Sequence, residues 1–482
     1  MEVLSMSNKL PTPLLGERET IISCRNSQGS EVRATPVRLT RFTVVFEVYN
    51  PFSIVQLSEV LSEFRITVKD RLMYRGRAVV SSLVNTGIML MVEATLEEAW
   101  LDVDLFQPAG SREQLVAEFS EFLQEWRKIH FVTPEFKVVV ADMQTLLADL
   151  RRWMEQVELG IRSAPAGDRS QLERNVLEEL GLGVMPTIHE LFQRFESIAG
   201  AIDPQLQPMH RTYIKRQLHP LVLCSPFAFR TYQKPLGYAG DYEMVNMILR
   251  DPLEGGSLFA KTVNLYFLNS APALAHRNRI RYLVETLTGE ARRVAATGRS
   301  VRILNLGCGP AGEIQEMLQT DPICDSMDFT LMDFNDETLE FTQTRLEKLR
   351  AQHGRRTAIQ FVKKSVHQVL KDGSRPSSPK TRYEIVYCAG LFDYLSDRIC
   401  QRLMNIFYDL LEPGGLLIAT NVDPCNPTRC GMEFILDWHL IYRDSKQLLQ
   451  LHPLSAPQGN VVTKSDDTGV NIYIEVRKPA AA

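Results

Sequence analysis

Three glycines follow a short apolar run and are spaced Gly307-x-Gly309-x-x-Gly312. The run Val301–Leu306 favours a β-strand and Glu313–Leu318 favours a helix, so the pattern predicts a strand, a tight turn and a helix. Glycines at such a turn let a ligand approach the backbone closely, and the unpaired N–H groups at a helix start suit an anion. The turn alone does not distinguish a nucleotide site from a purely structural turn.

An acidic residue ends the next predicted strand. Phe329–Asp333 reads FTLMD, so Asp333 follows an apolar run that comes after the first strand, turn and helix. In a doubly wound sheet, a carboxylate at this place can receive both hydroxyl groups of a ribose. The glycine turn and Asp333 together therefore predict a site for a ligand that contains a nucleoside.

The elements that must position these residues alternate from about residue 300 onward. Alternation of strand and helix is typical of a doubly wound, mostly parallel sheet. The chain ends differently, because Val461–Lys464 and Val470–Val476 flank a turn and predict an antiparallel hairpin. The other predicted strands are Phe329–Met332, Ile359–Val362, Glu384–Cys388 and Leu416–Asn421, and the other predicted helices are Glu337–Arg350 and Arg398–Leu411.

These segments resemble the ordered motifs of the class I S-adenosylmethionine-dependent methyltransferases over about 180 residues. The matching stretches are LNLGCGPAG (304–312), LMDFN (331–335), FVKKSVHQV (361–369), YEIVYCAGLFDYL (383–395) and LEPGGLLIATN (411–421). The resemblance implies a Rossmann-like domain with a seven-stranded sheet and S-adenosyl-L-methionine as cofactor. It implies that the cofactor-binding residues are Asn305, Gly307, Cys308, Gly309, Gly312, Asp333, Phe334, Ser365, Val366, His367, Cys388, Ala389 and Gly390.

The chain departs from that family after the third strand of the sheet. Families often place an aspartate there for the amino group of adenine, whereas this chain offers Ser365 and His367. A dehydrogenase on a related sheet is disfavoured by the terminal hairpin and by LNLGCGPAG. A nucleotide-responsive signalling protein on a degenerate methyltransferase fold remains the alternative to an enzyme.

A second unusual block, Arg230–Glu243, reads RTYQKPLGYAGDYE and precedes a predicted helix at Glu243–Arg250. Its glycines and tyrosines are poor helix or strand formers, so we expect an ordered loop. One interpretation is a turn between two helices, with Asp241 as the helix cap. The other is a lid, in which Tyr238 and Tyr242 cover the sulfonium, Asp241 complements its charge, and all three orient the reaction.

Two blocks support a narrower resemblance over about residues 205–482. KPLGYAGDYEM (234–244) and FILDWHLIYRD (434–444) resemble bacterial extracellular-factor proteins for the biosynthesis of 3-hydroxypalmitic acid methyl ester. This resemblance implies a role in quorum sensing and, as acceptor, the carboxylate of a 3-hydroxy fatty acid or similar small acid, which needs no general base. The candidates for substrate binding are Arg230, Lys234, Arg277, Arg279, Trp438 and Tyr442, and ordinary surface roles are the alternative for the four cations.

The N-terminal region has the pattern of short strands. Thr43–Tyr49, Arg77–Leu83 and Ile88–Val92 predict a small β-barrel, which resembles the PilZ domains that bind cyclic-di-GMP in bacteria. The residues compared with the PilZ motifs are Arg33, Arg38, Arg41 and Ser81–Gly87. The arginine spacing is one residue short and the second motif lacks its acid and serine, so tight binding of cyclic-di-GMP is not expected.

The length of 482 residues suits two to four domains, at about 100 to 200 residues each. We predict a loose tail at 1–19, a PilZ-like barrel at 20–106, a helical segment at 110–215, a helical lid and substrate region at 216–298, and the methyltransferase domain at 299–482. The helical segment is predicted from a possible capping box at residue 111 and from two apolar stripes. The stripes are Leu146, Leu147, Leu150, Met154 and Val157, and Ile188, Leu191, Phe192, Phe195 and Ile198.

Composition narrows the class of protein further. The formal charge of −4 shows no excess of positive charge of the kind that binds nucleic acid. No apolar run reaches the roughly 18 residues of a membrane helix and no signal peptide is recognised, so we expect a cytoplasmic protein. Eight scattered cysteines do not form a disulfide framework, and Cys425, Cys430 and His439 lack the spacing of a metal site. The oligomeric state is not determined by the sequence.

Overall fold

The computed structural model describes residues 20–39, 42–49, 55–68, 71–85, 89–97, 120, 131–373 and 381–480. The chain divides into two compact units, one made of residues 1–55 and 59–115 and the other of residues 56–58 and 116–482. The predicted tail at 1–19, the helix predicted from residue 111, and Arg41, Thr86 and Gly87 lie outside the described residues. The finer domain boundaries given above remain predictions.

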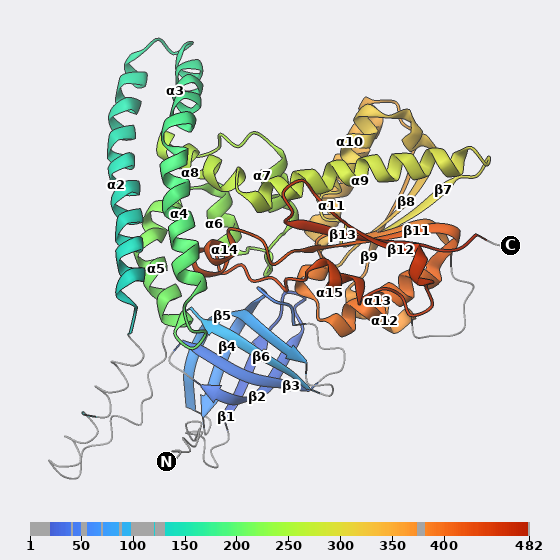
Figure 1. Ribbon diagram of the computed structural model, residues 1–482, viewed down its shortest axis with the longest axis horizontal. Coiled ribbons are helices and arrows are strands. Elements are labelled where there is room, and N and C mark those ends of the chain that lie inside the picture. Colours follow the sequence, from blue (N-terminus) through green and yellow to red (C-terminus); the bar gives the residue numbers. More distant parts are fainter. Residues whose placement is uncertain are drawn as a thin grey trace, which may run out of the picture. The chain divides into compact units, whose positions relative to one another are not determined.

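The first unit is a closed barrel of six antiparallel strands in the order β1-β2-β3-β6-β5-β4 (Figure 1). Alternate residues point inward, and the interior holds buried aromatic and aliphatic side chains such as Phe46, Phe64 and Val80. The predicted small β-barrel is therefore confirmed. Its strands are β1 (Thr20–Arg25), β2 (Glu31–Leu39), β3 (Thr43–Tyr49), β4 (Val60–Val68), β5 (Arg71–Asn85) and β6 (Met89–Leu96).

The second unit begins with a helical bundle. Helices α2 and α4 run side by side in Figure 1 and pack through rings such as Phe136 and Phe195, whose centroids are 5.8 Å apart. The two predicted apolar stripes lie on these helices, so the helical middle segment is confirmed. No described helix is long and apolar enough to span a bilayer. The bundle contains α2 (Pro134–Ser163), α3 (Arg169–Gly183), α4 (Met185–Gly200) and α5 (Gln207–Val222).

Four helices connect the bundle to the sheet. They are α6 (Pro226–Gln233), α7 (Tyr242–Leu249), α8 (Leu258–Leu268) and α9 (Ala271–Ala295). Side chains cap three of them at the N-terminus, because Ser225, Asp241 and Ser257 each accept a hydrogen bond from a backbone N–H in the first turn. The long helix α9 lies across the sheet that follows (Figure 1).

The sheet has seven strands in the order β12-β13-β11-β10-β7-β8-β9. Strands β7 to β11 are parallel, and β13 is antiparallel to both β11 and β12. The predicted doubly wound sheet with its terminal hairpin is therefore confirmed. The strands are β7 (Val301–Leu306), β8 (Met327–Asp333), β9 (Ala358–Lys363), β10 (Tyr383–Cys388), β11 (Leu411–Val422), β12 (Val461–Ser465) and β13 (Asn471–Arg477).

Helices cover both faces of the sheet. One core joins α9, α10 and α11 to β7, β8 and β10, and the other joins α12 and α13 to β10, β11 and β13. The chain leaves β7 in one direction through β8 and β9 and then returns to β10 on the other side of β7. Ligands of such sheets bind at the carboxyl ends of the strands beside this switch point. These helices are α10 (Gly312–Thr320), α11 (Asp336–Gln352), α12 (Val366–Gly373) and α13 (Asp397–Leu410).

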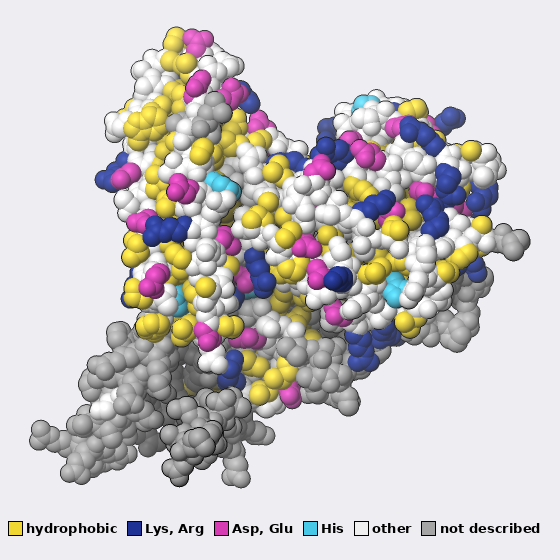
Figure 2. Space-filling model, in the orientation of Figure 1, with side chains coloured by type: hydrophobic (Ala, Val, Ile, Leu, Met, Phe, Trp, Pro, Cys, Tyr) yellow, Lys and Arg dark blue, Asp and Glu magenta, His cyan; other side chains and the backbone are white. Residues whose placement is uncertain are grey.

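Two short helices, α14 (Arg429–Ile435) and α15 (Ser445–Leu449), follow β11 and were not predicted from the sequence, nor was α12. Each has at most eight residues, which is too short for a helical period to stand out. Single-turn helices at Pro322–Ser326, Phe392–Tyr394 and Gln458–Asn460 complete the unit. Figure 2 shows Lys and Arg interspersed with Asp and Glu over its helices on the face drawn.

Candidate functional site

The glycine turn joins β7 to α10 at the switch point of the sheet. Gly307 and Gly309 have φ angles of +73° and +51°, in the left-handed region that glycine adopts without strain. The backbone N–H groups of Gly307 and Cys308 donate to the carbonyl of Met332, at 2.8 and 3.1 Å. These bonds fix the turn against the end of β8, so the predicted strand, turn and helix are present.

The glycines of the turn serve different purposes. A Cβ atom on Gly309 would meet no heavy atom within 4 Å, so this position opens onto free space. A Cβ atom on Gly312 would lie 2.8 Å from Cδ1 of Leu249, so the third glycine lets α10 pack closely against α7. The open side at Gly309 is therefore the side on which a ligand can approach the backbone.

Asp333 ends β8 directly beside this turn. Its Oδ2 accepts a hydrogen bond from the N–H of Gly309 at 3.3 Å, and its Oδ1 accepts one from the N–H of Asn335 at 3.1 Å. Burial raises the pKa of Asp333, while these N–H bonds oppose that shift. The structure thus brings together the two features that the sequence analysis connected.

A buried polar cluster lies beneath the turn. The hydroxyl of Tyr387 donates to Oε1 of Glu313 at 2.6 Å, and Nδ2 of Asn305 is 3.4 Å from the same oxygen. Burial raises the pKa of Glu313. Oδ1 of Asn305 has no hydrogen-bond partner. Asn305 was predicted from the sequence as a cofactor-binding residue, whereas Glu313 and Tyr387 were not. The available signal for Glu313 was an acid directly after the last glycine of the turn.

The segment proposed to lie beside adenine is the start of α12. Ser365, Val366 and His367 are half-buried there. The N–H of Ser365 donates to Oε1 of Gln368 at 2.8 Å, which fixes the beginning of the helix. The N–H of Lys364 donates to the carbonyl of Asp333 at 2.8 Å, so the end of β9 is joined to the end of β8.

The loop after β10 carries the remaining residues proposed to bind the cofactor. Cys388 is buried inside the strand, and Ala389 and Gly390 are half-buried. Gly390 has a φ of +85°, and its N–H donates to Oγ1 of Thr420 at 2.9 Å. A Cβ atom on Gly390 would lie 2.9 Å from Nη1 of Arg279, so glycine is required by both the backbone and the guanidinium.

Asp241 is buried, and both of its carboxylate oxygens accept hydrogen bonds from neighbouring residues. Its Oδ1 accepts a hydrogen bond from the N–H of Met244 at 2.8 Å, which makes it the N-cap of α7. Nε of Arg230 donates to both carboxylate oxygens, at 2.9 and 3.1 Å. These contacts agree with the interpretation of the block as a turn that caps helix α7.

The loop also lies close to the segment after β10, because a Cβ atom on Gly240 would be 2.8 Å from the Tyr394 hydroxyl.

The two tyrosines of the block have different neighbours. The ring centroid of Tyr238 is 5.2 Å from that of Phe334, directly after Asp333, and burial raises its pKa. The ring of Tyr242 lies 4.7 Å from that of Phe341 on α11, and its hydroxyl donates to Glu337 at 2.8 Å. The structure therefore places Tyr238 beside Phe334, next to Asp333, and Tyr242 against the face of α11.

Two of the other cations proposed for substrate binding hold backbone carbonyls. Nζ of Lys234 donates to the carbonyl of Leu436 at 3.1 Å. Arg277 donates from Nε to Ile248 at 2.9 Å and from Nη2 to Leu268 at 2.6 Å, and burial lowers its pKa. These bonds join Arg277 to the ends of α7 and α8 and join Lys234 to the segment after α14.

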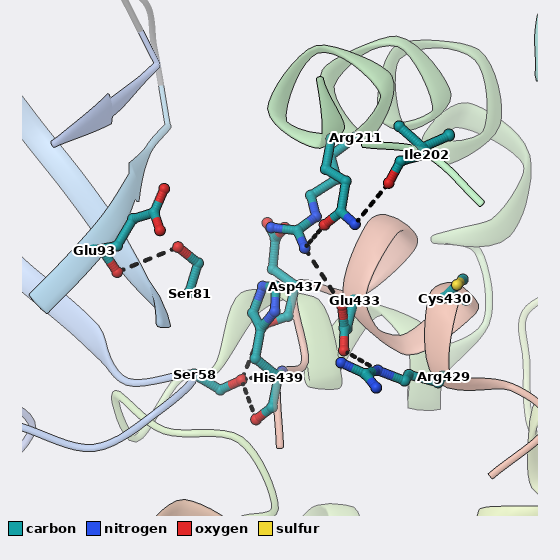
Figure 3. Close-up of polar contacts among 12 residues, drawn as sticks. Ser58, Ser81, Glu93, Ile202, Arg211, Arg429, Cys430, Glu433, Asp437 and His439 are labelled. Atoms are coloured by element: carbon teal, nitrogen blue, oxygen red, sulfur yellow. Dashed lines mark hydrogen bonds and ion pairs between the residues drawn. The ribbon is translucent and has the colours of Figure 1, made fainter. Parts of the chain in front are cut away.

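A network of charged residues, most of them buried, holds the segment 429–443 (Figure 3). Glu433 accepts from Arg429 at 2.8 Å and from Arg211 at 3.4 Å. Asp437 accepts two bonds from Nζ of Lys215, at 2.9 and 3.1 Å. Burial opposes ionisation of Asp437, but the positive charges of Lys215 and Lys234 prevail and lower its pKa to about 2. Ser58 Oγ donates to the carbonyl of His439 at 2.9 Å within the same unit.

The two aromatic residues proposed for substrate binding lie on this segment. Nε1 of Trp438 donates to the hydroxyl of Tyr394 at 2.9 Å, which connects the segment to the loop after β10. The guanidinium of Arg429 lies over the ring of Tyr442, 4.6 Å from its centroid. Trp438 and Gly240 therefore both lie close to the Tyr394 hydroxyl.

In the barrel, three described residues of the proposed nucleotide motifs have partners within the barrel. Arg33 pairs with Glu31 at 2.9 Å, and Arg38 pairs with Glu93 at 3.8 Å. Oγ of Ser81 donates to the carbonyl of Glu93 at 3.2 Å (Figure 3).

Within the described part of the chain, no group of three or more His, Cys, Asp or Glu side chains is placed to hold a metal ion.

No protein-family model and no curated protein sequence matches this chain. Among solved structures, it is similar to a protein described as a possible exported protein from Bordetella parapertussis, with 18% identity and a TM-score of 0.40, over 52% of this chain and 86% of that chain. It is also similar to magnesium protoporphyrin IX methyltransferase from Synechocystis PCC 6803 with bound SAH, with 9% identity and a TM-score of 0.33, over 56% of this chain and 99% of that chain.

A third similar structure is N-methyltransferase NodS from Bradyrhizobium japonicum WM9 in complex with S-adenosyl-L-homocysteine. The identity is 13% and the TM-score 0.30, over 52% of this chain and 99% of that chain. At these TM-scores and identities, the similarities carry no inference about what this chain binds or catalyses. Its function is therefore inferred from its own residues.

Proposed function

We propose that this chain is an S-adenosylmethionine-dependent methyltransferase. The observation that carries the proposal is the Asp333 carboxylate, which is buried at the end of β8 with Oδ2 3.3 Å from the N–H of Gly309. A carboxylate at this place beside a glycine turn suits the two hydroxyls of a ribose. The free space on Gly309 supports the same assignment, because a ligand can approach the backbone there.

The residues present fit such a donor. Asp333 would receive the ribose, the turn at Gly307 and Gly309 would pass beneath the ligand, and Phe334 with Ser365–His367 would border the adenine. Bound there, the donor supplies a methyl group on a positively charged sulfur, which an acceptor oxygen displaces in line. The task of the chain is therefore alignment and exclusion of water more than acid or base catalysis.

The proposed acceptor is the carboxylate of a 3-hydroxy fatty acid or similar small acid, converted to its methyl ester in the cytoplasm. What supports it is the resemblance of residues 234–244 and 434–444 to the extracellular-factor proteins. A carboxylate is ionised at neutral pH, so it attacks without a general base. Arg230, Lys234 and Arg277 already bond within the fold, so they do not add support for this acceptor.

Replacement of Asp333 tests the donor site. In Asp333→Ala, the loss of hydrogen bonds to a charged group should weaken binding of S-adenosylhomocysteine by about 1.5 to 3 kcal/mol, or roughly 10- to 150-fold, in titration calorimetry. Asp328→Ala is the matched control, because Asp328 lies exposed on the same strand and its carboxylate accepts a hydrogen bond from Ser300. Equal affinity in wild type and Asp333→Ala would refute the donor site.

The acceptor is tested with methyl-labelled donor and 3-hydroxyhexadecanoate, and the product is identified by mass spectrometry. Formation of the labelled methyl ester is expected. Methyl 3-hydroxyhexadecanoate, in which the carboxyl group is blocked, is the control and should take no label. Labelling of this control would show that the hydroxyl group, and not the carboxylate, accepts the methyl group. Donor binding without turnover of any acid would favour the signalling alternative.

A further inference from the structure

Strand β13 carries two buried polar side chains with unpaired oxygen atoms. Asn471 and Tyr473 are each 2% exposed, and among the described residues neither Oδ1 of Asn471 nor the hydroxyl of Tyr473 has a hydrogen-bond partner. Their register partners are Val422 and Thr420, at the carboxyl end of β11. The two oxygens therefore lie at the edge of the sheet where folds of this kind bind their ligands.

Helix α9 covers the same face of this strand. The ring of Tyr473 stacks on that of Tyr282 from α9, with centroids 4.0 Å apart. Because side chains alternate along a strand, Asn471 points to this face as well. Asp466 makes a second connection, since it accepts a hydrogen bond from Nδ2 of Asn278 on α9 at 2.7 Å and another from the N–H of Asn471 at 2.9 Å. One turn of α9 thus lies against the start of β13.

Arg279 belongs to this turn of α9. A Cβ atom on Gly390 would lie 2.9 Å from its Nη1. The N–H of Gly390 in turn donates to Oγ1 of Thr420, the register partner of Tyr473, at 2.9 Å. The guanidinium therefore reaches the same ends of β10 and β11 as the two unpaired oxygens of β13.

The guanidinium of Arg279 has no counter-charge in contact. The residue is 9% exposed, its Nε has no hydrogen-bond partner, and no described carboxylate forms an ion pair with it. Its Nη2 lies 3.0 Å from Nδ1 of His276, and burial lowers the pKa of that imidazole well below its usual value, so the ring is neutral. An arginine stays charged inside a protein, and a buried charge without a counter-charge is costly. An anion beside Arg279 would remove this cost.

The three groups differ in what they can bind. A guanidinium pairs best with a carboxylate. Oδ1 of Asn471 can only accept a hydrogen bond, whereas the hydroxyl of Tyr473 can donate one, and an aliphatic hydroxyl both donates and accepts. A 3-hydroxy acid carries a carboxylate and a hydroxyl that are separated by one methylene group. A plain fatty acid would satisfy Arg279 and leave the two oxygens of β13 unpaired.

We propose that Arg279, Asn471 and Tyr473 recognise the polar end of a 3-hydroxy acid acceptor. Arg279 pairs with the carboxylate, while the 3-hydroxyl group donates to Oδ1 of Asn471 and accepts from the hydroxyl of Tyr473. This inference rests on the proposed function and names the residues that select a 3-hydroxy acid over a plain fatty acid. Asn471 and Tyr473 were not among the candidates from the sequence.

This assignment is compatible with methyl transfer to the carboxylate. One carboxylate oxygen pairs with Arg279 while the other forms the bond to the methyl carbon. The bond from that carbon to sulfur breaks, the sulfur keeps the electron pair, and no proton moves. The ester that results is uncharged, so Arg279 holds it less tightly than the acid, which favours release of the product.

The test compares 3-hydroxyhexadecanoate with hexadecanoate in initial rates of methyl transfer by the full chain. Wild type should prefer the hydroxy acid in kcat/KM by about tenfold or more, because plain acid leaves buried groups unpaired. Tyr473→Phe and Asn471→Leu should each reduce this preference by roughly threefold to tenfold. Arg279→Gln should raise KM for both acids by about tenfold or more, with S-adenosylhomocysteine affinity within twofold of wild type.

Tyr282→Phe is the matched control for Tyr473→Phe. Both variants remove one hydroxyl from the same pair of stacked rings, but the hydroxyl of Tyr282 already donates to Glu475. Tyr282→Phe should therefore lower the melting temperature and leave the preference between the two acids unchanged. Tyr473→Phe should change the preference without lowering the melting temperature, because its hydroxyl has no partner among the described residues.

The outcomes separate this inference from the proposed function. Wild-type protein that does not bind S-adenosylhomocysteine, or that methylates neither acid, refutes the proposed function. Wild-type turnover with the same preference in Tyr473→Phe as in wild type refutes the assignment of the hydroxyl site, and this variant serves alone if Asn471→Leu does not fold. Reduced S-adenosylhomocysteine affinity with an unchanged KM for both acids in Arg279→Gln refutes the assignment of the carboxylate site.

Discussion

Single buried acids set the electrostatic character of the proposed site. Asp333, Glu313 and Asp393 surround the carboxyl ends of β7, β8 and β10, and burial raises the pKa of each, that of Asp393 to about 6. Hydrogen bonds from backbone N–H groups or a tyrosine oppose the shift in every case. Acidic side chains at this edge of the sheet suit a donor that carries a positively charged sulfur.

Tyr238, in the loop after α6, and Tyr242, at the start of α7, should behave differently. In Tyr238→Ala, loss of the aromatic ring beside Phe334 should weaken S-adenosylhomocysteine binding or slow methyl transfer by several-fold, as expected for about 1 kcal/mol. Tyr242→Ala should stay within twofold of wild type, because that ring packs on Phe341. Calorimetry and initial rates measure both effects. Equal losses in the two variants would restore the view that both rings cover the sulfonium.

The low pKa of Asp437 predicts a specific acid sensitivity. Because its pKa is lowered from about 3.8 to about 2, ionised Asp437 stabilises the folded state above about pH 4, and this stabilisation is lost as the pH falls toward 2. Asp437→Asn tolerates the left-handed backbone and should lower the free energy of unfolding at pH 6 by on the order of 2 kcal/mol.

Urea unfolding of wild type and Asp437→Asn at a series of pH values measures this difference. The difference should shrink between pH 4 and pH 2. Asp409→Asn is the control, since Asp409 is exposed on α13 and should show no such difference. A difference that is constant with pH would mean that Asp437 acts through packing and not through its charge.

At the scale of elements, the site is assembled from three junctions of strand and helix. The turn from β7 to α10 supplies the glycines, the end of β8 supplies Asp333, and the loop after β10 supplies Gly390. Helix α9 adds Arg279 from outside the sheet, and residues 437–442 add Trp438 through its bond to Tyr394. Each of these contacts joins residues that are far apart in the chain.

The glycine turn allows a paired test of space against backbone strain. Gly309 and Gly298 both have a positive φ, +51° and +76°, and at both a Cβ atom would meet nothing within 4 Å. Replacement of either by alanine should cost about 1 kcal/mol of stability for the left-handed backbone. Only Gly309→Ala should also weaken S-adenosylhomocysteine binding, by tenfold or more, because its Cβ enters the ligand side.

Thermal unfolding and calorimetry on both variants separate the two effects. Gly298 lies in the exposed turn after α9, away from the site. If Gly309→Ala binds S-adenosylhomocysteine as tightly as Gly298→Ala does, the free space at Gly309 is not part of a ligand site.

At the scale of the whole molecule, the chain combines a β-barrel unit with the unit that holds the proposed methyltransferase site. The barrel arginines Arg33 and Arg38 pair with carboxylates of the barrel itself. Such exposed pairs are weak, so they do not by themselves prevent binding of an anion. The departures of the sequence from the PilZ motifs are therefore the main ground for expecting no tight cyclic-di-GMP site.

Titration of the full chain with cyclic-di-GMP should accordingly show no saturable binding at low micromolar ligand. A defined isotherm with one or two molecules bound per chain would contradict this expectation. It would also make regulation by the barrel a central question, and the measurement of methyl transfer with and without cyclic-di-GMP would follow.

The sequence by itself determined the parts of the site that depend on neighbouring residues. The glycine turn, the strand before it and the acid at the end of the next strand all follow from local patterns of glycine, apolar residues and helical spacing. The alternation of elements from residue 300, together with the terminal hairpin, was sufficient to predict the seven-stranded sheet. Short helices such as α12 and α14 were missed, because a few residues show no clear period.

Only the tertiary structure decided which charged side chains are free to bind a ligand. Arg277 and Arg279 are two residues apart and were equivalent candidates, yet Arg277 bonds to carbonyls of α7 and α8 whereas Arg279 faces Gly390. In the same way, Asp241 became a helix cap paired with Arg230. The partner of a side chain depends on how distant elements pack, and the packing of α9 against the sheet is not encoded in the spacing of residues along the helix.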